Sequence, residues 1–273
     1  MANQVVLVTG ASAGIGKATA KTLLAEGYTV YVAARRVGKM KDLEELGVIA
    51  IQMDITKETE VAAAVEQITA ENNGVDILVN NAGFGLYGAM EDISIDEARY
   101  QFEVNLFGLA RLTQLVLPYM RSQKSGKIIN ISSIGGKIYT PLGSWYYATK
   151  HALEGWSDCL RFELKAFNID VVIIEPGLIQ TEFGNVMIAP MMRRSGRGVY
   201  GNLAKTLARS SIDMYANNSA SKPQVVADLI LKAIKAKKPK TRYVGGKLAT
   251  PLLFARKWGG DRLFDWLIGN MLK

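Results

Sequence analysis

The N-terminal segment restricts the fold of this chain more than any other stretch. Residues 4–9 form a short apolar run rich in β-branched side chains, and Gly10, Gly14 and Gly16 follow it before a helix-forming stretch that reaches Glu26. A strand that ends in glycines and opens into a helix is typical of a dinucleotide-binding fold, because the glycines let backbone amides approach a pyrophosphate. The spacing is G-x-x-x-G-x-G rather than G-x-G-x-x-G. A tight turn that binds nothing is the alternative interpretation.

Strand-like and helix-like segments alternate along the rest of the chain. Strand-sized apolar runs occur near residues 4–9, 28–34, 48–53, 75–80, 127–132, 169–175 and 241–244. Helices are predicted near residues 14–26, 57–72, 96–122 and 146–167. This alternation predicts a single-domain α/β protein, a doubly wound Rossmann fold whose parallel sheet is covered by helices on both faces. A chain of 273 residues with 49% hydrophobic content can bury one core of that size.

The predicted domain covers residues 1–245, and residues 246–273 are expected to add an amphipathic C-terminal extension. Within the domain, residues 177–221 lack strong periodicity and are too long for an ordinary connection. Long irregular insertions of this kind are often lids or binding loops. Ligands of open α/β sheets bind beyond the carboxyl ends of the strands, so we expect this insertion to lie over the site.

Composition narrows the class of protein further. The longest apolar runs are strand-sized, so no membrane span is predicted, and the first strand begins too early to leave room for a signal peptide. The one cysteine, Cys159, excludes an internal disulfide and suits a reducing compartment. We expect it to be a small apolar filler within a helix. The sequence therefore favours a cytoplasmic protein.

Tyr146 and Lys150 are four residues apart in a predicted helix, and Ser133 precedes the tyrosine by thirteen residues. Residues i and i+4 share one helix face, so the phenol and the ammonium can point into one pocket. A cation beside a phenol favours the phenolate and lowers a pKa that is ordinarily about 10. The phenol then acts as a general acid and base toward a carbonyl or alcohol oxygen, which Ser133 can hold by a hydrogen bond. A tyrosine packed beside a lysine on an ordinary helix is the alternative.

Two neighbouring residues compete for the catalytic role. Tyr147 has no lysine at i+4 and is not expected to face Lys150. His151, the one histidine of the chain, is turned off the Lys150 face by about 100°, because a helix has 3.6 residues per turn. We therefore expect His151 to be structural and Tyr146 to be the catalytic phenol.

Together these residues resemble the short-chain dehydrogenase/reductase family over nearly the whole chain, and most of all its branch that acts on steroids, retinoids and long-chain acyl ketones. The resemblance implies that Lys150 holds the nicotinamide ribose and that Asn105 anchors a water linking Lys150 to solvent. The motifs that match in order and spacing are Thr9-Gly10-x-x-x-Gly14-Ile15-Gly16, Asn80-Asn81-Ala82-Gly83, Asn105, the set Ser133, Tyr146 and Lys150, and Pro176-Gly177 with Thr181.

The turn after the second predicted strand indicates the cofactor. An acidic residue there would hold the ribose hydroxyls of NAD, but Arg35 and Arg36 occupy the turn. Guanidinium groups match phosphate oxygens in bidentate geometry, so the sequence predicts NADP(H); two solvated charges are the alternative. The resemblance implies that Asp54 contacts the adenine, and no metal site is predicted. The residues expected to bind the cofactor are Gly10, Ser12, Ala13, Gly14, Ile15, Gly16, Arg35, Arg36, Asp54, Asn81, Ala82, Gly83, Tyr146, Lys150, Pro176, Gly177 and Thr181.

The predicted substrate is a bulky apolar ketone or alcohol rather than a sugar, because methionines and aromatic side chains are concentrated near the expected site. A lid that packs only on its own core is the alternative. Arg193, Arg194 and Arg197 either meet an anionic group on the substrate or are solvated. The apolar candidates are Phe183, Val186, Met187, Ile188, Met191, Met192 and Met214 in the insertion, with Ile138, Tyr139, Leu142 and Trp145 before Tyr146.

The positive charge of the chain is confined to its C-terminal part. Residues 232–273 have a net charge of +9 and residues 1–231 of −1, which together give the +8 of the whole chain. No nucleic-acid motif accompanies this charge, so no nucleic-acid partner is expected. Trp258 and Trp266 are side chains favoured at a lipid headgroup boundary, so the tail is a candidate for peripheral membrane contact; packing over the lid or a partner subunit is the alternative. The apolar residues at helical spacing are Leu263, Phe264, Leu267, Ile268, Met271 and Leu272.

The sequence thus predicts an NADP(H)-dependent oxidoreductase that interconverts a ketone and a secondary alcohol. A catalytically idle NADP(H)-binding sensor or scaffold is the alternative, although such a protein has no need for a tuned phenol. The resemblance implies a homodimer in which the helices near 96–122 and 146–167 pair across a two-fold axis. It also implies that the tail covers a second interface that tetrameric relatives use.

Overall fold

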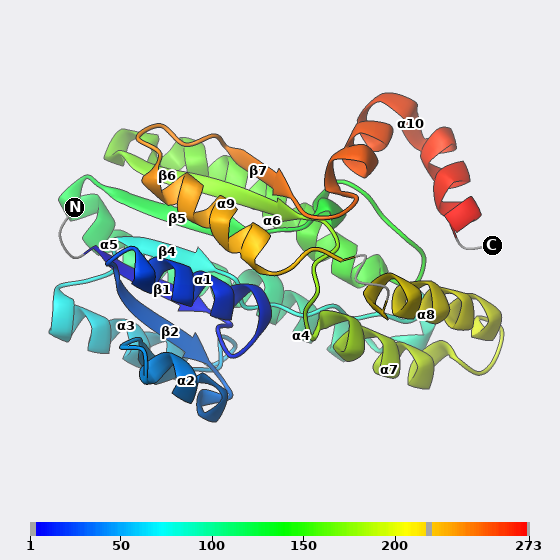
Figure 1. Cartoon of the computed structure of the whole chain (residues 1–273), viewed down its shortest axis with the longest axis horizontal. Helices are drawn as coiled ribbons and strands as arrows, with labels where there is room; N and C mark the ends of the chain where they lie inside the picture. The colour runs from blue at the N-terminus through cyan, green and yellow to red at the C-terminus, as the bar shows by residue number, and fades with distance from the viewer. Residues whose placement is uncertain (1–3, 217–219, 272–273) are drawn as a thin grey trace.

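The computed structural model describes residues 4–216 and 220–271. Of the residues named above, Leu272 lies outside the described residues, and the side chains of Met214 and Met271 are not described. A seven-stranded parallel sheet runs through the molecule in the order β3-β2-β1-β4-β5-β6-β7 (Figure 1). Its strands are β1 (Val5–Thr9), β2 (Thr29–Ala34), β3 (Ile49–Gln52), β4 (Ile77–Asn80), β5 (Gly126–Ile131), β6 (Ile169–Pro176) and β7 (Arg242–Gly245).

Helices cover both faces of this sheet, which confirms the predicted doubly wound fold of a single α/β domain. Alternate residues of β1 point to opposite faces: Val6 and Val8 pack with α1, α2 and α9, whereas Val5 and Leu7 pack with α3, α5 and α6. Figure 1 shows α1 and α9 on the face nearer the viewer. The helices are α1 (Gly14–Ala25), α2 (Lys41–Glu44), α3 (Glu58–Asn72), α4 (Ile95–Phe102), α5 (Gly108–Gln123), α6 (Ser144–Leu164), α7 (Phe183–Ser195), α8 (Gly201–Ala216), α9 (Gln224–Lys235) and α10 (Ala249–Met271).

The crossover from β3 to β4 determines where a ligand-binding crevice forms on the sheet. The chain builds β1, β2 and β3 toward one edge of the sheet and then returns to the other side of β1. A reversal of strand order leaves a crevice at the carboxyl ends of the strands beside it, here β1 and β4. Within the described residues, no helix has the length and hydropathy that a membrane crossing requires.

The helix predicted near residues 96–122 is interrupted. A π-helical turn at Glu103–Phe107 separates α4 from α5. An extra residue in one helical turn rotates the side chains that follow it, and such turns are frequent at functional sites. Here the turn contains Asn105, whose side chain is 1% exposed.

The insertion at residues 177–221 is helical rather than irregular, which corrects the sequence-based expectation. Most of it forms the helical pair α7 and α8. The buried face of α8 consists of Ala204, Leu207, Ala208 and Ser211, which recur at helical spacing. Three of these four side chains are small, so the periodicity is weak when only large apolar residues are considered.

The C-terminal tail, α10, consists of two helical segments that meet at a kink, where Gly260 has the non-helical values φ 66° and ψ −175°. Phe264 and Ile268 are buried against Ile138 and Tyr139 from the loop that follows β5. The tail is therefore packed on the domain. Cys159, expected as a filler, is exposed on α6 instead.

Candidate active site

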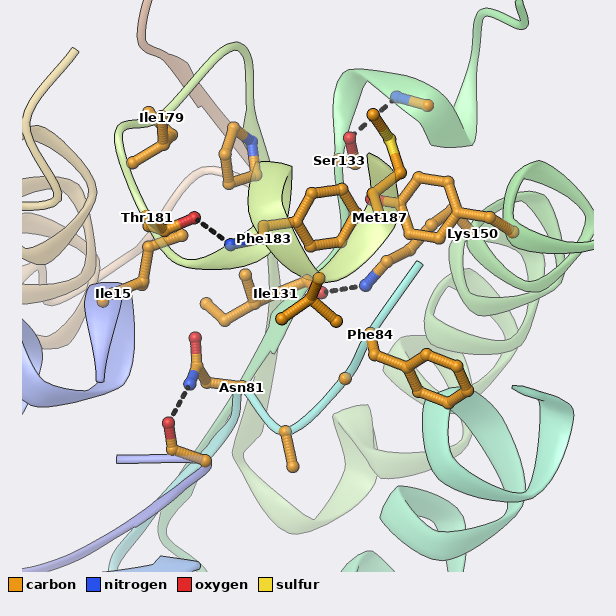
Figure 2. Close-up of a pocket in the computed structure, with 18 of the residues that line it drawn as sticks. Ile15, Asn81, Phe84, Ile131, Ser133, Lys150, Ile179, Thr181, Phe183 and Met187 are labelled. Carbon is orange, nitrogen blue, oxygen red and sulfur yellow. Dashed lines mark hydrogen bonds between the residues drawn. The ribbon is translucent and has the colours of Figure 1, made fainter. Parts of the chain in front are cut away.

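A cavity of about 480 Å³ lies beyond the carboxyl ends of β1, β4, β5 and β6 (Figure 2). It brings together nearly all of the predicted catalytic and cofactor-binding residues. Two of them, Gly16 and Asn105, lie behind its wall. The sequence-predicted residues that line it are Gly10, Ser12, Ala13, Gly14, Ile15, Arg35, Arg36, Asp54, Asn81, Ala82, Gly83, Ser133, Tyr146, Lys150, Pro176, Gly177 and Thr181.

The glycine turn is packed against the end of β4. A Cβ atom on Gly10, which has φ +69°, would lie 2.8 Å from the Cα of Ala82, and one on Gly16 would lie 2.5 Å from Asn81 Nδ2. Only glycine fits at such distances. The Asn81 side-chain amide donates to the Thr9 carbonyl over 2.9 Å, and the Thr9 hydroxyl accepts from the Asn81 and Ala82 amides over 3.0 Å each. Thr9 belongs to the glycine motif of the sequence. Only the structure shows that its hydroxyl joins the turn after β1 to the loop after β4.

The helix that follows the turn fits an anionic cofactor group. α1 begins at Gly14 after Ala13, which cannot cap it with a side chain, and its first turn contains no acidic residue. The first amides of a helix then remain available to a phosphate, which the positive end of the helix dipole also favours. A Cβ on Gly14 would lie 3.0 Å from Thr181 Cγ2, so the turn after β6 closes on this helix end. The residues present therefore fit the pyrophosphate of a nicotinamide dinucleotide.

The two arginines lie at the edge of the cavity beside the helix end. Arg36 donates to the Ser12 hydroxyl and to Glu182 Oε2, over 3.2 Å each. Lys39 Nζ lies 3.2 Å from Glu182 Oε1, and these two cations lower the pKa of the Glu182 carboxyl. Arg35 donates to the Tyr100 hydroxyl over 3.0 Å. The sequence reasoning missed Glu182, because nothing local connects a residue after β6 with the turn after β2.

Asp54 lies at the edge of the cavity, and its expected contact with the adenine stays a prediction. It follows β3 and lines the cavity, and its Oδ1 accepts from the Thr56 amide over 3.0 Å and from the Thr56 hydroxyl over 2.9 Å. These bonds fix the carboxylate at the cavity edge.

Ser133 and Tyr146 face the same cavity. The Ser133 hydroxyl oxygen accepts from the Gly135 amide over 3.0 Å (Figure 2), and a hydroxyl that accepts one bond can still donate its proton. Tyr146 lies in the first turn of α6 and is 8% exposed. Its ring packs against Tyr87 and Phe183, with centroid distances of 5.7 and 5.5 Å.

Lys150 is buried one helical turn below Tyr146. Its ammonium donates to the Ile131 carbonyl over 2.8 Å (Figure 2), which points the side chain toward the end of β5. Burial lowers the pKa of Lys150 from 10.5 to about 8, and the nearby Glu154 carboxylate opposes that shift. An ammonium in this environment is charged at neutral pH but readily loses its proton.

Asn105 connects two walls of the site from behind. Its Oδ1 accepts from the Phe84 amide over 3.1 Å, and its Nδ2 donates to the Phe84 carbonyl over 3.0 Å and to the Thr149 hydroxyl over 3.1 Å. The side chain thus ties the loop after β4 to the catalytic helix. Its expected role in holding a water stays a prediction.

The two competing residues are engaged elsewhere. The Tyr147 hydroxyl lies 2.8 Å from the Thr140 hydroxyl and 3.4 Å from that of Tyr87, and burial raises the pKa of Tyr147. Tyr147 does line the cavity. His151 is exposed, with Nδ1 2.9 Å from the Tyr147 carbonyl.

The far half of the cavity is apolar, and only part of its wall was anticipated. Phe183, Val186, Met187 and Ile138 line it as expected. The other described candidates pack behind the wall or beside it: Ile188, Met191, Met192, Tyr139, Leu142 and Trp145. The wall also contains residues that sequence reasoning did not place there, namely Ile179, Leu207, Leu252 and Ile268.

The insertion arginines do not line this cavity. Arg194 instead forms an ion pair with Glu97 at 2.6 Å and donates to the Tyr87 carbonyl over 3.2 Å. The ion pair joins α7 to α4. Arg194 therefore stabilises the position of the helical pair α7 and α8, which is called the lid below.

A parallel sheet with a glycine turn that fits a pyrophosphate, beside a Ser–Tyr–Lys set, defines a nucleotide-binding oxidoreductase. The chain matches the family model described as short chain dehydrogenase over residues 4–192. It is 36% identical, over 100% of its length and 96% of the relative, to a 3-ketodihydrosphingosine reductase of Bacteroides thetaiotaomicron. This chain belongs to the short-chain dehydrogenase/reductase family.

Solved structures share the fold. A short-chain dehydrogenase from Streptomyces avermitilis matches with a TM-score of 0.76 and 32% identity, over 99% of this chain and 93% of that one. The closed form of a serine dehydrogenase complexed with NADP⁺ matches with a TM-score of 0.78 and 28% identity. The match covers 90% of this chain and 95% of that one.

Proposed function

We propose that this protein is an NADP(H)-dependent oxidoreductase that interconverts a ketone and a secondary alcohol on a bulky apolar substrate of the steroid, retinoid or acyl-ketone type. The observation that carries the proposal is one cavity with two unlike halves. One half holds the glycine turn and Arg36, the other is apolar, and Ser133, Tyr146 and Lys150 line the same cavity.

The reacting oxygen is handled by Ser133 and Tyr146. When bound, the nicotinamide supplies a hydride to the carbonyl carbon or accepts one from the alcohol. Tyr146 gives its hydroxyl proton to the oxygen in reduction and recovers it in oxidation. Ser133 donates a hydrogen bond to the same oxygen and holds it against the phenol. The Lys150 ammonium favours the phenolate, and by family resemblance it also holds the nicotinamide ribose.

The basic edge of the cavity supports the choice of NADP(H). A 2′-phosphate is matched by guanidinium groups, and Arg35 and Arg36 both line the cavity at the end of β2. The serine dehydrogenase complex contains NADP⁺, which is consistent with this choice.

The apolar half supports the substrate class. Side chains from α7, α8 and α10 form it, and Met187 and Ile268 are only 7% exposed each. Such a wall excludes water and offers few partners to sugar hydroxyls. The relative named 3-ketodihydrosphingosine reductase fits a keto group on an apolar chain.

A homodimer is proposed as well, in which the helical region 96–122 (α4, the π-helical turn and α5) and the region 146–167 (mainly α6) pair across a two-fold axis. Both regions expose large apolar side chains: Phe107 in the π-helical turn is 51% exposed, Leu115 of α5 is 38% exposed and Phe162 of α6 is 69% exposed. A monomer by light scattering at micromolar concentration would contradict the dimer. A tetramer would contradict the further expectation that α10 covers a second interface.

The test is a kinetic screen with NADPH and NADH against steroids, retinals, 3-oxoacyl chains and simple aromatic ketones. The proposal requires faster oxidation of NADPH than of NADH with at least one bulky apolar ketone, and loss of that activity in Tyr146→Phe. Stoichiometric NADPH binding without turnover across the panel would instead favour an idle sensor or scaffold.

A further inference from the structure

Helix α10 has two unlike faces. Its inner face packs on the domain: Phe264 is fully buried, and Leu252 and Ile268 line the apolar half of the cavity. Its outer face exposes large aromatic side chains, with Trp258 69% exposed and Trp266 62% exposed. Burying the inner face therefore does not account for the tryptophans.

The exposed large apolar side chains form one pair on each side of the kink at Gly260. Phe254, 66% exposed, is four residues before Trp258, and their ring centroids are 6.4 Å apart. After the kink, Leu263 is 46% exposed and precedes Trp266 by three residues. Residues three and four apart share a helix face. Phe254 and Trp258 therefore share a face of the first segment, and Leu263 and Trp266 share a face of the second. The four residues together are called the aromatic face below.

Helix α10, which carries the aromatic face, lies at the same end of the molecule as α7 and α8 (Figure 1), whose side chains also line the apolar half of the cavity. Val186 of α7 lines the cavity and is also 49% exposed, so the apolar wall reaches the surface. Val199, between α7 and α8, is 89% exposed, and Ile212 of α8 is 51% exposed.

Positive charge accompanies this apolar surface. Lys257 and Arg262 are exposed on α10, and the Lys257 ammonium lies 5.1 Å from the Trp258 ring centroid. Asp261 is paired with Arg256, and Asp265 accepts from the Tyr139 hydroxyl over 2.9 Å. Both acids are themselves exposed, but each is bonded to another side chain, whereas Lys257 and Arg262 form no ion pair within the part of the chain that the structure describes.

We propose that the aromatic face of α10 docks this protein on an anionic lipid surface. Tryptophan is favoured at the headgroup boundary, and basic side chains are attracted to anionic lipids. A second copy of the chain fits less well, because a two-fold interface places the same patch on both subunits. Two patches that both carry Lys257 and Arg262 would then face each other, whereas an anionic surface complements them.

Docking in this orientation has a consequence for the substrate. The helix that contacts lipid with one side lines the cavity with the other, so docking would bring the apolar wall of the cavity close to the bilayer. This consequence rests on the proposed ketone chemistry, whereas the proposed docking on lipid is independent of that chemistry.

The test is flotation of the full-length protein with vesicles of phosphatidylcholine and phosphatidylglycerol, and with vesicles of phosphatidylcholine alone, at low and moderate salt. The wild type is expected to float with the anionic vesicles and to be released by salt. Trp258→Ser/Trp266→Ser and Lys257→Glu/Arg262→Glu should each reduce the bound fraction at least tenfold. Leu46→Ser, a 56% exposed residue before β3, is the matched apolar control and should leave binding unchanged.

A matched charge control is Lys57→Glu/Lys165→Glu, which changes the net charge equally at two exposed positions outside α10. If this control and Lys257→Glu/Arg262→Glu lose equal amounts of the vesicle-bound fraction, net charge alone explains the loss, and the assignment of binding to α10 is overturned. Failure of the wild type to float would overturn docking altogether. A fall in oligomer mass in Trp258→Ser/Trp266→Ser would assign the face to a second copy. Flotation does not depend on turnover, so a failed ketone screen leaves its result unaffected.

Discussion

Arg36 and Glu182 join two segments that are 146 residues apart in the chain, with Arg36 Nη2 3.2 Å from Glu182 Oε2. Arg36 belongs to the turn after β2, and Glu182 immediately precedes the lid helix α7. Lys39 reaches the same carboxylate. The region expected to hold a 2′-phosphate is therefore bonded directly to the lid over the substrate.

Replacing the basic turn should reverse the cofactor preference. In Arg35→Asp/Arg36→Ala, the affinity for NADPH should fall at least tenfold, because each charge-assisted hydrogen bond contributes about 1.5–3 kcal/mol. The affinity for NADH should rise, since an acidic residue there can hold both ribose hydroxyls. Fluorescence titration with both cofactors measures the change. Arg99→Ala, 74% exposed at the side chain and paired with Asp96, is the control; a wild type that prefers NADH would exclude this reading.

Tyr146→Phe should reduce kcat by about 10²–10⁴-fold, the usual contribution of a general acid or base. The affinity for NADP(H) should stay nearly unchanged, because the substitution removes only the hydroxyl. Tyr147→Phe is the matched control, since the Tyr147 hydroxyl is bonded to Thr140 and Tyr87. Steady-state kinetics and cofactor titration on both variants are the measurement. The opposite result, with activity lost only in Tyr147→Phe, would move the catalytic role by one residue.

The rate of ketone reduction should fall as the pH rises through about 8. Burial lowers the pKa of Lys150 to about 8, so above that pH the ammonium loses the proton that supports the Tyr146 phenolate. Glu154 opposes the shift, and therefore Glu154→Gln should move this descending limb to lower pH. Glu163→Gln, on the exposed side of the same helix, should leave the profile in place. A limb that does not move in Glu154→Gln would mean that another group controls it.

Glu175→Gln should stabilise the protein at pH 8 but not at pH 4.5. Burial, reinforced by Glu154, raises the pKa of Glu175 from 4.5 to about 7, although Arg242 and Lys137 oppose the shift. The folded state then binds the proton more tightly than the unfolded chain. The contribution of Glu175 to stability is therefore fully present below about pH 4.5 and is lost as the pH rises through about 7.

The gain at pH 8 should be about 1–3 kcal/mol, since one pKa unit corresponds to about 1.36 kcal/mol. Urea unfolding at the two pH values measures it, with Glu66→Gln as an exposed control. A loss of stability in Glu175→Gln at pH 8 would show that the ion pair with Arg242, 3.5 Å away, outweighs the burial of charge.

The sequence by itself determined the α/β fold and the positions of most candidate site residues. The reason is that each signal is local. Gly10, Gly14 and Gly16 lie in the turn after β1 and the first turn of α1. Tyr146 and Lys150 lie one helical turn apart, and Ser133 lies two residues beyond the end of β5. In a parallel sheet the residues that follow the strands meet at one edge, so local signals suffice to bring them together.

Only the tertiary structure decided which side chains complete the site. The helical pair over the cavity was missed because small residues form much of its buried face. The π-helical turn that brings Asn105 to Phe84 has no signature in hydrophobic spacing. Glu182 beside Arg36, and Ile268 of the tail in the cavity wall, depend on contacts between distant segments. Such contacts arise when separate elements pack against one another, and no periodicity within a single element encodes them.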